Sequence, residues 1–267
     1  GVPHHLLDVV SPNQSYSVAE FQAGAYAAID GILSRGNTPF LVGGTGLYVR
    51  AVTEGFTFTD ARPDPALRAK LEGKTTAELY ALLREKTGVT LTDGEEFNRQ
   101  RLMRSVEKAL SGQWESPPPR PRYDCLLLGV TFPRDLVCRR IDERLQRRLD
   151  DGMIEEVARL RAEGASDAFL EGLGLEYRYI LWYLTGKLSS RDELFDELGR
   201  AIKRFAKRQM VWFKKDRDVL WLDTEGDPLS QAVRAADAFL KRQYKGVAIF
   251  FGVVFIVLLI MHFGFGL

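Results

Sequence analysis

Residues 41–50 read LVGGTGLYVR, and this stretch decides the fold class. The apolar run over residues 38–43 is short and ends in glycine, which is typical of a buried parallel strand. Three glycines within residues 43–46 then form a turn, and residues 47–52 begin a helix. A strand, a glycine turn and a helix in this order predict an α/β domain with a parallel sheet.

The segments around this stretch fit the same fold class. Residues 17–34 predict an amphipathic helix, because Ser17 and Glu20 have the spacing of a capping box. Residues 123–132 (YDCLLLGVTF) predict a second buried strand, and residues 218–222 (DVLWL) a short terminal one. Further helices are expected over residues 134–149, 154–162, 177–184, 190–213 and 228–241.

A helical insert interrupts this pattern. The turn-forming sequence ARPDP at residues 61–65 marks its start, and the proline-rich residues 117–121 form a stiff linker at its end. Between them, helices are predicted over residues 65–72, 76–86 and 96–111, with no strand pattern. We therefore expect a two-part α/β core, residues 1–60 and 119–243, with an all-helical insert over residues 61–118.

Composition and charge narrow the function classes. With 45% hydrophobic and 27% charged residues in a chain of 267, most of the protein is expected to fold as a soluble globule, and disorder is excluded. Basic residues gather on predicted helices at 99–104, 139–148 and 203–217, which indicates either a polyanion partner or solvated helix faces. Cys125 and Cys138 match no metal-ligand spacing, so a reduced cytoplasmic protein is expected.

The C-terminal residues 244–267 form a separate hydrophobic tail. Residues 246–267 contain no formally charged side chain, and such a stretch is long enough to span a bilayer as a helix. The basic residues 241–245 before it would keep the preceding domain in the cytoplasm. We expect either a transmembrane helix that anchors a cytoplasmic protein or a gene-model artefact.

The glycine turn is one candidate binding element. A glycine turn that opens a helix directs backbone N–H groups toward an anion, and Thr45 adds a hydroxyl group. An ordinary structural turn explains the same residues, and no GxxxxGK[ST] phosphate loop occurs in the sequence.

Arginine pairs on two predicted helices are further candidates. Arg101 and Arg104 share one helix face, where guanidinium groups can form bidentate bonds to phosphate; a charged surface helix is the alternative. Arg140 and Arg144 are four residues apart and suit a pyrophosphate, unless Asp142 and its neighbours pair with them.

Two aromatic or titratable segments are less specific. Residues 206–215 interleave basic residues with Trp212, which suits RNA phosphates and a stacked base, although a core position for Trp212 is favoured. His4 and His5 are adjacent, so on an extended chain they point to opposite faces and do not share a metal ion.

Seven segments, taken in order, are far more specific than any one of them. They read GVPHHLLDVVSP, YSVAEFQ, LVGGTGLYVRA, NRQRLMRSVE, GMIEEVARL, GLEYR and AKRQMVWF. From residue 1 to about residue 223 the chain resembles the tRNA dimethylallyltransferase family. The resemblance implies a P-loop-kinase-like parallel sheet flanked by helices, in which the helical insert embraces the anticodon stem-loop of tRNA.

The same resemblance implies an activity. In this family a dimethylallyl group moves from dimethylallyl diphosphate to N6 of the flipped adenosine 37, next to the anticodon, with Mg²⁺ as cofactor. The protein is expected to be a monomer. The resemblance implies tRNA binding by Thr45, Arg68, Gln100, Arg101, Leu102, Met103, Arg104, Arg178, Arg208 and Gln209, diphosphate binding by Arg140 and Arg144, and a catalytic candidate in His4.

Two features of the family have no match. These are the phosphate-binding loop GxTGxGK[ST], with its strand and helix, and an Asp-Ser pair whose aspartate is the general base. The sequence therefore predicts an N-terminally truncated enzyme that is inactive as this fragment and holds no metal ligand of its own. The alternatives are a non-catalytic, membrane-tethered RNA-binding protein and a P-loop-kinase-like phosphotransferase.

Overall fold

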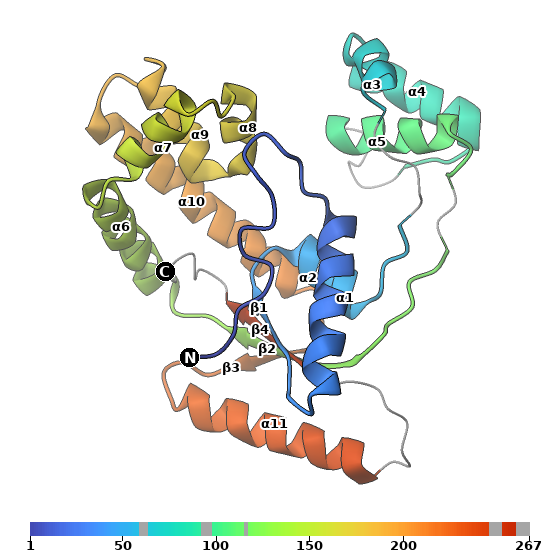
Figure 1. Cartoon of the computed structure of the whole chain (residues 1–267), viewed down its shortest axis with the longest axis vertical. Coiled ribbons are helices and arrows are strands. Elements are labelled where there is room, and N and C mark those ends of the chain that lie inside the picture. The colour runs from blue at the N-terminus through green and yellow to red at the C-terminus, as the bar shows by residue number, and fades with distance from the viewer. Residues whose placement is uncertain (59–63, 92–97, 115–116, 246–252, 260–267) are drawn as a thin grey trace. The chain divides into compact units, whose positions relative to one another are not determined.

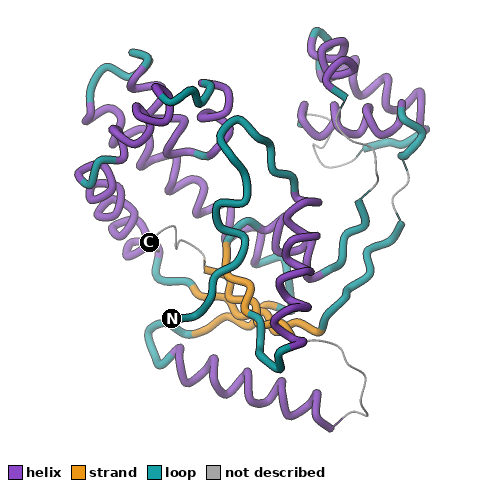
Figure 2. Tube along the Cα trace, viewed as in Figure 1, coloured by secondary structure: helices purple, strands orange, loops and turns teal. Residues whose placement is uncertain are grey.

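A computed structural model describes residues 1–58, 64–91, 98–114, 117–245 and 253–259. The chain forms two compact units, one of Gly1–Glu54 with Pro121–Leu267 and one of Gly55–Arg120. Figures 1 and 2 show a parallel sheet with helices in the first unit and helices joined by loops in the second.

The sheet of the first unit has four parallel strands. They are β1 (Phe40–Gly43), β2 (Asp124–Val130), β3 (Val219–Leu222) and β4 (Val253–Leu259), in the order β1-β4-β2-β3. Val257 of β4 lies opposite Val42 on one side and Leu128 on the other. The α/β fold class with a parallel sheet, predicted from the sequence, is confirmed.

The central strand corrects one prediction. Residues 246–267 were expected to form a transmembrane helix or an artefact, but Val253–Leu259 pairs along its length with β2 and over four residues with β1. A short apolar run satisfies its backbone groups in this way inside a parallel sheet, and strands buried on both faces share this composition. Residues 246–252 and 260–267 of the tail lie outside the described residues. No helix in the described parts of the chain has the length and apolarity to cross a membrane.

Helices cover both faces of the sheet (Figure 1). On one face, α1 (Val18–Ser34) and α2 (Gly46–Thr53) pack with the sheet in a core that includes Ile29, Val52 and Leu127. The predicted capping box is present, since the Ser17 hydroxyl accepts from the Glu20 N–H at 3.2 Å. On the other face, α11 (Pro228–Lys245) packs on β2 and β3.

Five more helices complete the first unit. They are α6 (Arg134–Asp150), α7 (Met153–Ala162), α8 (Asp167–Leu173), α9 (Leu175–Leu184) and α10 (Arg191–Phe213). They share a second core that includes Leu145, Leu170, Ile180 and Leu194. The helix α8 was not predicted. The long helix α10 contacts α6 and α9 and also reaches α2, so it joins this core to the sheet.

The second unit consists of α3 (Pro65–Glu72), α4 (Thr76–Thr87) and α5 (Arg99–Leu110). Its core is built from Leu71, Leu79, Leu83, Leu102 and Val106. The N–H of Arg120 donates to the carbonyl of Gly55 at 2.9 Å, which pairs the segments by which the chain enters and leaves the unit. Residues 61–63 of the expected boundary and residues 96–97 of the expected third helix lie outside the described residues.

Candidate functional site

The glycine turn connects the carboxyl end of β1 to the N-terminus of α2. Thr45 is the N-cap of α2, and its carbonyl accepts from the N–H groups of Tyr48 at 2.9 Å and Val49 at 3.1 Å. Its side chain is exposed and makes no capping hydrogen bond. The Thr45 hydroxyl therefore faces solvent at a helix N-terminus, where backbone N–H groups favour anions.

Helix α10 holds this turn in place through two side chains. Gln209 is 6% exposed, and its Nε2 donates to the carbonyl oxygen of Gly44 at 2.9 Å. The ring of Trp212 packs on Gly46 so closely that an added Cβ would lie 2.2 Å from a ring carbon. Gln209 was expected to contact tRNA, but its buried amide binds the glycine turn instead. Trp212 packs against the core of the sheet, as favoured from the sequence.

The arginines expected to bind diphosphate lie along α6. Arg140 is exposed and stacks over the Phe132 ring, with its guanidinium carbon 4.3 Å from the ring centre. Arg144 lies one turn further, and burial, with Arg148 next to it, lowers its pKa. Glu176 partly offsets this, and it pairs with Arg148 at 3.5 Å. Asp142, which lies between the two arginines in sequence, pairs with Lys203 at 2.7 Å. A row of cations on one helix suits an anionic ligand.

Arg178 on α9 is used within the protein. Its Nε and Nη2 donate to the carbonyl oxygen of Glu171 at 3.1 and 2.9 Å, at the end of α8. A guanidinium that binds the last turn of a helix satisfies a carbonyl that lacks an intrahelical partner. The expected role of Arg178 in tRNA binding has no separate support in this geometry.

The catalytic candidate His4 and the remaining tRNA candidate of the first unit, Arg208, are exposed. His4 lies in the N-terminal segment with its side chain in solvent. Arg208 is exposed on α10, where its guanidinium carbon lies 5.6 Å from the centre of the Phe205 ring. Both side chains are accessible to a ligand.

In the second unit, two expected tRNA-binding arginines meet at one carboxylate. Glu107 of α5 is 3% exposed, and it accepts from Arg68 of α3 at 2.5 Å and from Arg104 at 3.0 Å. The side chains of Arg68 and Arg104 remain 43% and 34% exposed. Burial and then the nearby Arg104 lower the pKa of Lys108, so positive charge is concentrated here.

The other residues of the QRLMR segment divide by helix face. Gln100 and Arg101 are exposed on α5, whereas Met103 packs partly against the core of the unit. Leu102 is 1% exposed and belongs to that core. The amphipathic pattern of α5 turns Leu102 inward, and its expected contact with tRNA stays a prediction.

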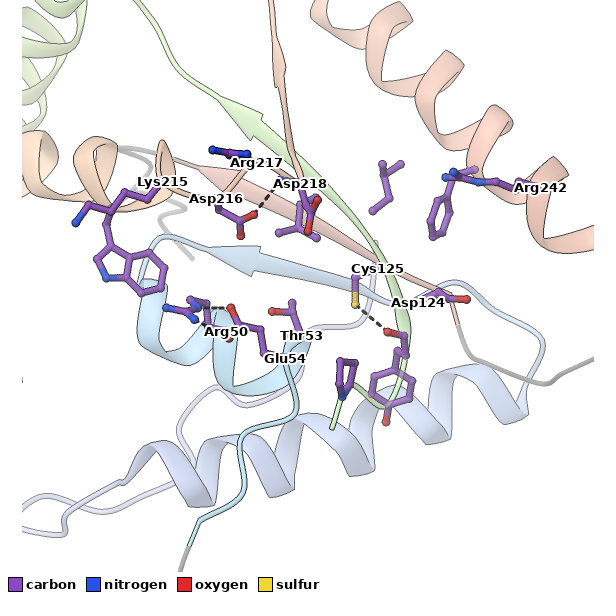
Figure 3. Close-up of a pocket in the computed structure, with 16 residues that line it drawn as sticks. Arg50, Thr53, Glu54, Asp124, Cys125, Lys215, Asp216, Arg217, Asp218 and Arg242 are labelled. Atoms are coloured by element: carbon purple, nitrogen blue, oxygen red, sulfur yellow. Dashed lines mark hydrogen bonds and ion pairs between the residues drawn. The ribbon is translucent and has the colours of Figure 1, made fainter. Parts of the chain in front are cut away.

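A cavity of about 850 Å³ lies at the amino ends of β2 and β3 (Figure 3). It is separate from the glycine turn, which follows the carboxyl end of β1. The labelled side chains of the cavity include Arg50, whose Nη2 donates to Glu54 at 2.6 Å, and Asp216, which accepts from the Asp218 N–H at 3.0 Å. Burial, with a smaller effect of Asp124, raises the pKa of the Cys125 thiol to about 12, so the thiol is neutral near pH 7. The cavity thus contains the Arg50–Glu54 ion pair and a neutral thiol.

Sequence reasoning missed the buried partner of the arginines. Among the described residues, Glu107 is the one buried side chain that carries a charge, and its spacing from Arg104 was visible as an i, i+3 pair. Its contact with Arg68 was not, because the two residues lie on different helices. The pair between Lys203 of α10 and Asp142 of α6, at 2.7 Å, was missed for the same reason.

Comparisons with known proteins agree on one family. Residues 1–216 match the sequence profile of a family described as IPP transferase. The chain is 37% identical to a tRNA dimethylallyltransferase from Pelotomaculum thermopropionicum, over 84% of this chain and 74% of that protein. It is 39% identical to tRNA dimethylallyltransferase 2 from Shewanella sediminis, over 86% of this chain and 78% of that protein.

Solved structures show the same relationship. The full-length tRNA isopentenylpyrophosphate transferase from Bacillus halodurans is 32% identical, with a TM-score of 0.63 over 92% of this chain and 79% of that one. A eukaryotic dimethylallyltransferase acting on tRNA has the same fold, with a TM-score of 0.70 over 91% of this chain and 66% of that one, at 20% identity. With the sequence match over most of its length, this chain belongs to the IPP transferase family, the family of the tRNA dimethylallyltransferases.

Proposed function

We propose that this chain acts in tRNA modification by prenyl transfer: it binds the anticodon stem-loop of tRNA and dimethylallyl diphosphate, the donor of a dimethylallyl group for N6 of adenosine 37. The observation that carries the proposal is the family match over residues 1–216. The arginine groups on α3, α5 and α6 support it, because they offer cations for two polyanionic ligands.

Binding of tRNA is assigned mainly to the helical unit. Arg68 and Arg104 lie side by side on one carboxylate, and Arg101 and Gln100 are exposed on the same helix as Arg104. Arginine binds phosphate through two parallel N–H bonds, and glutamine reads a base edge or a backbone group. In the first unit, Thr45 at the glycine turn and Arg208 on α10 are the exposed candidates.

Binding of diphosphate is assigned to Arg140 and Arg144. As the allylic C–O bond breaks, both electrons of the bond stay with the diphosphate, and N6 of the adenosine forms the new bond to carbon. Cations fixed beside the leaving group stabilise this developing charge without reorganising during the reaction. The partly buried Arg144 suits this role, since burial removes water that would screen its charge.

The finer fold assignment is also a proposal. A parallel sheet flanked by helices, with the helical unit Gly55–Arg120 inserted between its first two strands in the chain, is the arrangement expected of a P-loop-kinase-like core with a tRNA-binding insert. In that arrangement Thr45 faces the reacting base, and His4, exposed in the N-terminal segment, is the remaining acid–base candidate of the first unit.

Magnesium enters the proposal as a counterion of the diphosphate. Mg²⁺ is commonly held by one or two carboxylates together with phosphate oxygens and water. Among the described residues, no three His, Cys, Asp or Glu side chains gather as a metal-binding group. We route no step of the reaction through the ion.

The rate of dimethylallyl transfer and the binding of tRNA are two separate properties of this chain. The sequence contains no GxxxxGK[ST] phosphate loop, and in this family such a loop cradles the diphosphate. We expect tRNA binding by this chain, and transfer of the dimethylallyl group is measured separately. No observation on the described residues favours a phosphotransferase or a membrane-tethered RNA-binding protein.

The experiment measures binding and chemistry in parallel. Fluorescence anisotropy with a labelled anticodon stem-loop, at salt concentrations from about 50 to 200 mM, should show affinity that falls steeply with salt, as expected of phosphate contacts. Arg68→Ala should weaken binding, whereas Lys187→Ala, which removes an exposed cation of the first unit, should not. A wild-type chain that binds no tRNA at any of these salt concentrations would contradict the proposal.

Mass spectrometry of digested tRNA, incubated with dimethylallyl diphosphate, measures the chemistry. A rise in N6-dimethylallyladenosine above the level in tRNA incubated without the protein supports the proposal. A rate equal to that of a family member with the phosphate loop would show that the reaction does not need that loop.

A further inference from the structure

The buried carboxylate of Glu107 is the feature that neither the sequence motifs nor the family match explains. It is one of the three polar or charged side chains buried among the described residues, and the other two, Gln22 and Gln209, are neutral. Burying a carboxylate is costly unless cations and hydrogen bonds compensate for its lost water. Here the compensation comes from two arginines rather than one.

The geometry uses both carboxylate oxygens. Oε1 accepts from the Nε of Arg68 at 2.5 Å, and Oε2 accepts from its Nη2 at 3.5 Å. Oε2 also accepts from the Nη1 of Arg104 at 3.0 Å. Arg68 comes from α3 and Arg104 from α5, so one carboxylate brings guanidinium groups from two helices to the same place.

Both arginines of this group remain accessible to a ligand. Their guanidinium groups share the Glu107 carboxylate, and the arginine side chains remain partly exposed, at 43% and 34%. Without Glu107 the two cations would repel each other and separate. A purely structural ion pair needs only one cation, and an apolar contact of similar size holds two helices together equally well.

We propose that Glu107 is a positioning residue, which fixes Arg68 and Arg104 as one dicationic surface for the phosphates of tRNA. The inference rests on the proposed function, because it needs tRNA as the ligand of the helical unit. A free arginine side chain loses rotamer entropy when it is fixed. Glu107 makes this loss part of folding, so that RNA binding does not incur it again.

Glu107→Gln separates positioning from net charge. The variant keeps the size of the side chain but removes one negative charge near an RNA-binding surface. Net charge alone predicts tighter tRNA binding, whereas positioning predicts weaker binding, by about tenfold at low salt. Tighter or unchanged binding by Glu107→Gln would overturn the inference.

A double-mutant cycle adds a measurement of tRNA binding that a purely structural role of Glu107 would leave unchanged. Arg68→Ala should weaken tRNA binding in the wild-type background and should change it less than about twofold in the Glu107→Gln background, because the arginine is no longer held in place. Equal losses in the two backgrounds would contradict positioning.

Thr75→Ala is the matched control for stability. It removes the side-chain N-cap of α4 in the same unit, which lowers the stability of the unit, and among the described contacts Thr75 touches neither arginine. When Thr75→Ala loses as much thermal stability as Glu107→Gln, it should still bind tRNA as the wild type does. If Thr75→Ala weakens tRNA binding as much as Glu107→Gln does, the effect of Glu107→Gln comes from lost structure alone.

A second variant covers the case in which Glu107→Gln does not fold. Arg68→Lys keeps the charge but lacks the two-pronged guanidinium, so positioning predicts weaker binding. Binding equal to that of the wild type would overturn the inference. If wild-type tRNA binding itself is absent, the proposed function fails and the inference falls with it; normal wild-type binding with unaffected variants overturns the inference alone.

Discussion

The Nε2 of Gln209 donates to the carbonyl oxygen of Gly44 at 2.9 Å and joins residues that lie 165 positions apart. This bond connects the last turns of α10 to the glycine turn that carries Thr45. The Gln209 amide is buried, and among the described contacts its Oε1 accepts no hydrogen bond. The position of the turn therefore depends on a helix that also packs against α6 and α9.

Replacing Gln209 with leucine should destabilise the first unit. The change replaces the amide with an apolar side chain of similar size and leaves the part-buried Gly44 carbonyl without its donor, which costs about 1–3 kcal/mol. Denaturant unfolding measures the loss. Arg208→Ala, at the neighbouring exposed position, is the control and should change stability by less than about 0.5 kcal/mol. Equal stability of the two variants would show that the Gln209 bond contributes nothing.

Two glycines of the turn give a second prediction. A Cβ at Gly46 would lie 2.2 Å from the Trp212 ring, so Gly46→Ala must displace the ring or the turn and should cost about 1–3 kcal/mol. Gly43→Ala is the matched control, because nothing lies within 4 Å of its added Cβ. Adding Trp212→Leu to Gly46→Ala should restore part of the loss. Equal effects of the two alanine variants on the unfolding midpoint would contradict this packing.

Most local structure of this chain could be predicted because its signals are local. The capping box at Ser17 and the apolar run before the glycine turn place α1 and β1 within a few residues. The tail could not be assigned from sequence, because an apolar run of this length reads equally as a membrane span or as a buried strand. Only pairing with β1 and β2 distinguishes the two, and pairing is a long-range property.

The candidate site shows the same difference between local features, which the sequence predicts, and long-range contacts, which it does not. The periodicity of α5 indicated that Leu102 faces inward and that Arg101 and Arg104 face outward. The partners of these side chains were not predictable, because Glu107 reaches Arg68 across two helices and Gln209 reaches Gly44 across most of the chain. Sequence alone thus identified which residues carry charge, while the fold decides which of them are held in place.

The contact between Tyr177 and Glu156 predicts a dependence on alkaline pH. Burial, and then the hydrogen bond that the Tyr177 hydroxyl donates to Glu156 at 2.5 Å, raise the pKa of Tyr177 to about 12, against about 10 in an unfolded chain. Between these values the folded state keeps a proton that the unfolded state loses. The stabilisation is therefore complete below about pH 10 and is lost as the pH rises through about 12.

Tyr177→Phe tests this dependence. The variant should remove about 1 kcal/mol of stability at neutral pH, a figure reduced for the partial exposure of the side chain, and should flatten part of the decline above pH 10. Tyr183→Phe on the same helix is the control, since its hydroxyl has no carboxylate partner among the described contacts. Unfolding followed across pH 7–12 measures both. Parallel pH profiles of Tyr177→Phe and the wild type would contradict the assignment.

The tail strand gives the last prediction. Val257 of β4 pairs with Val42 and Leu128, and β1 meets the rest of the sheet only through β4 among the described strands. Val257→Pro removes a backbone donor from the centre of the sheet and should destabilise the first unit by about 3 kcal/mol or more. Val257→Ala keeps that donor and is the control. A membrane-spanning tail predicts the opposite result: both variants would unfold at the same denaturant concentration as the wild type, because a tail in lipid adds nothing to the sheet. A large loss for Val257→Pro, well beyond that for Val257→Ala, identifies the tail as part of the catalytic core.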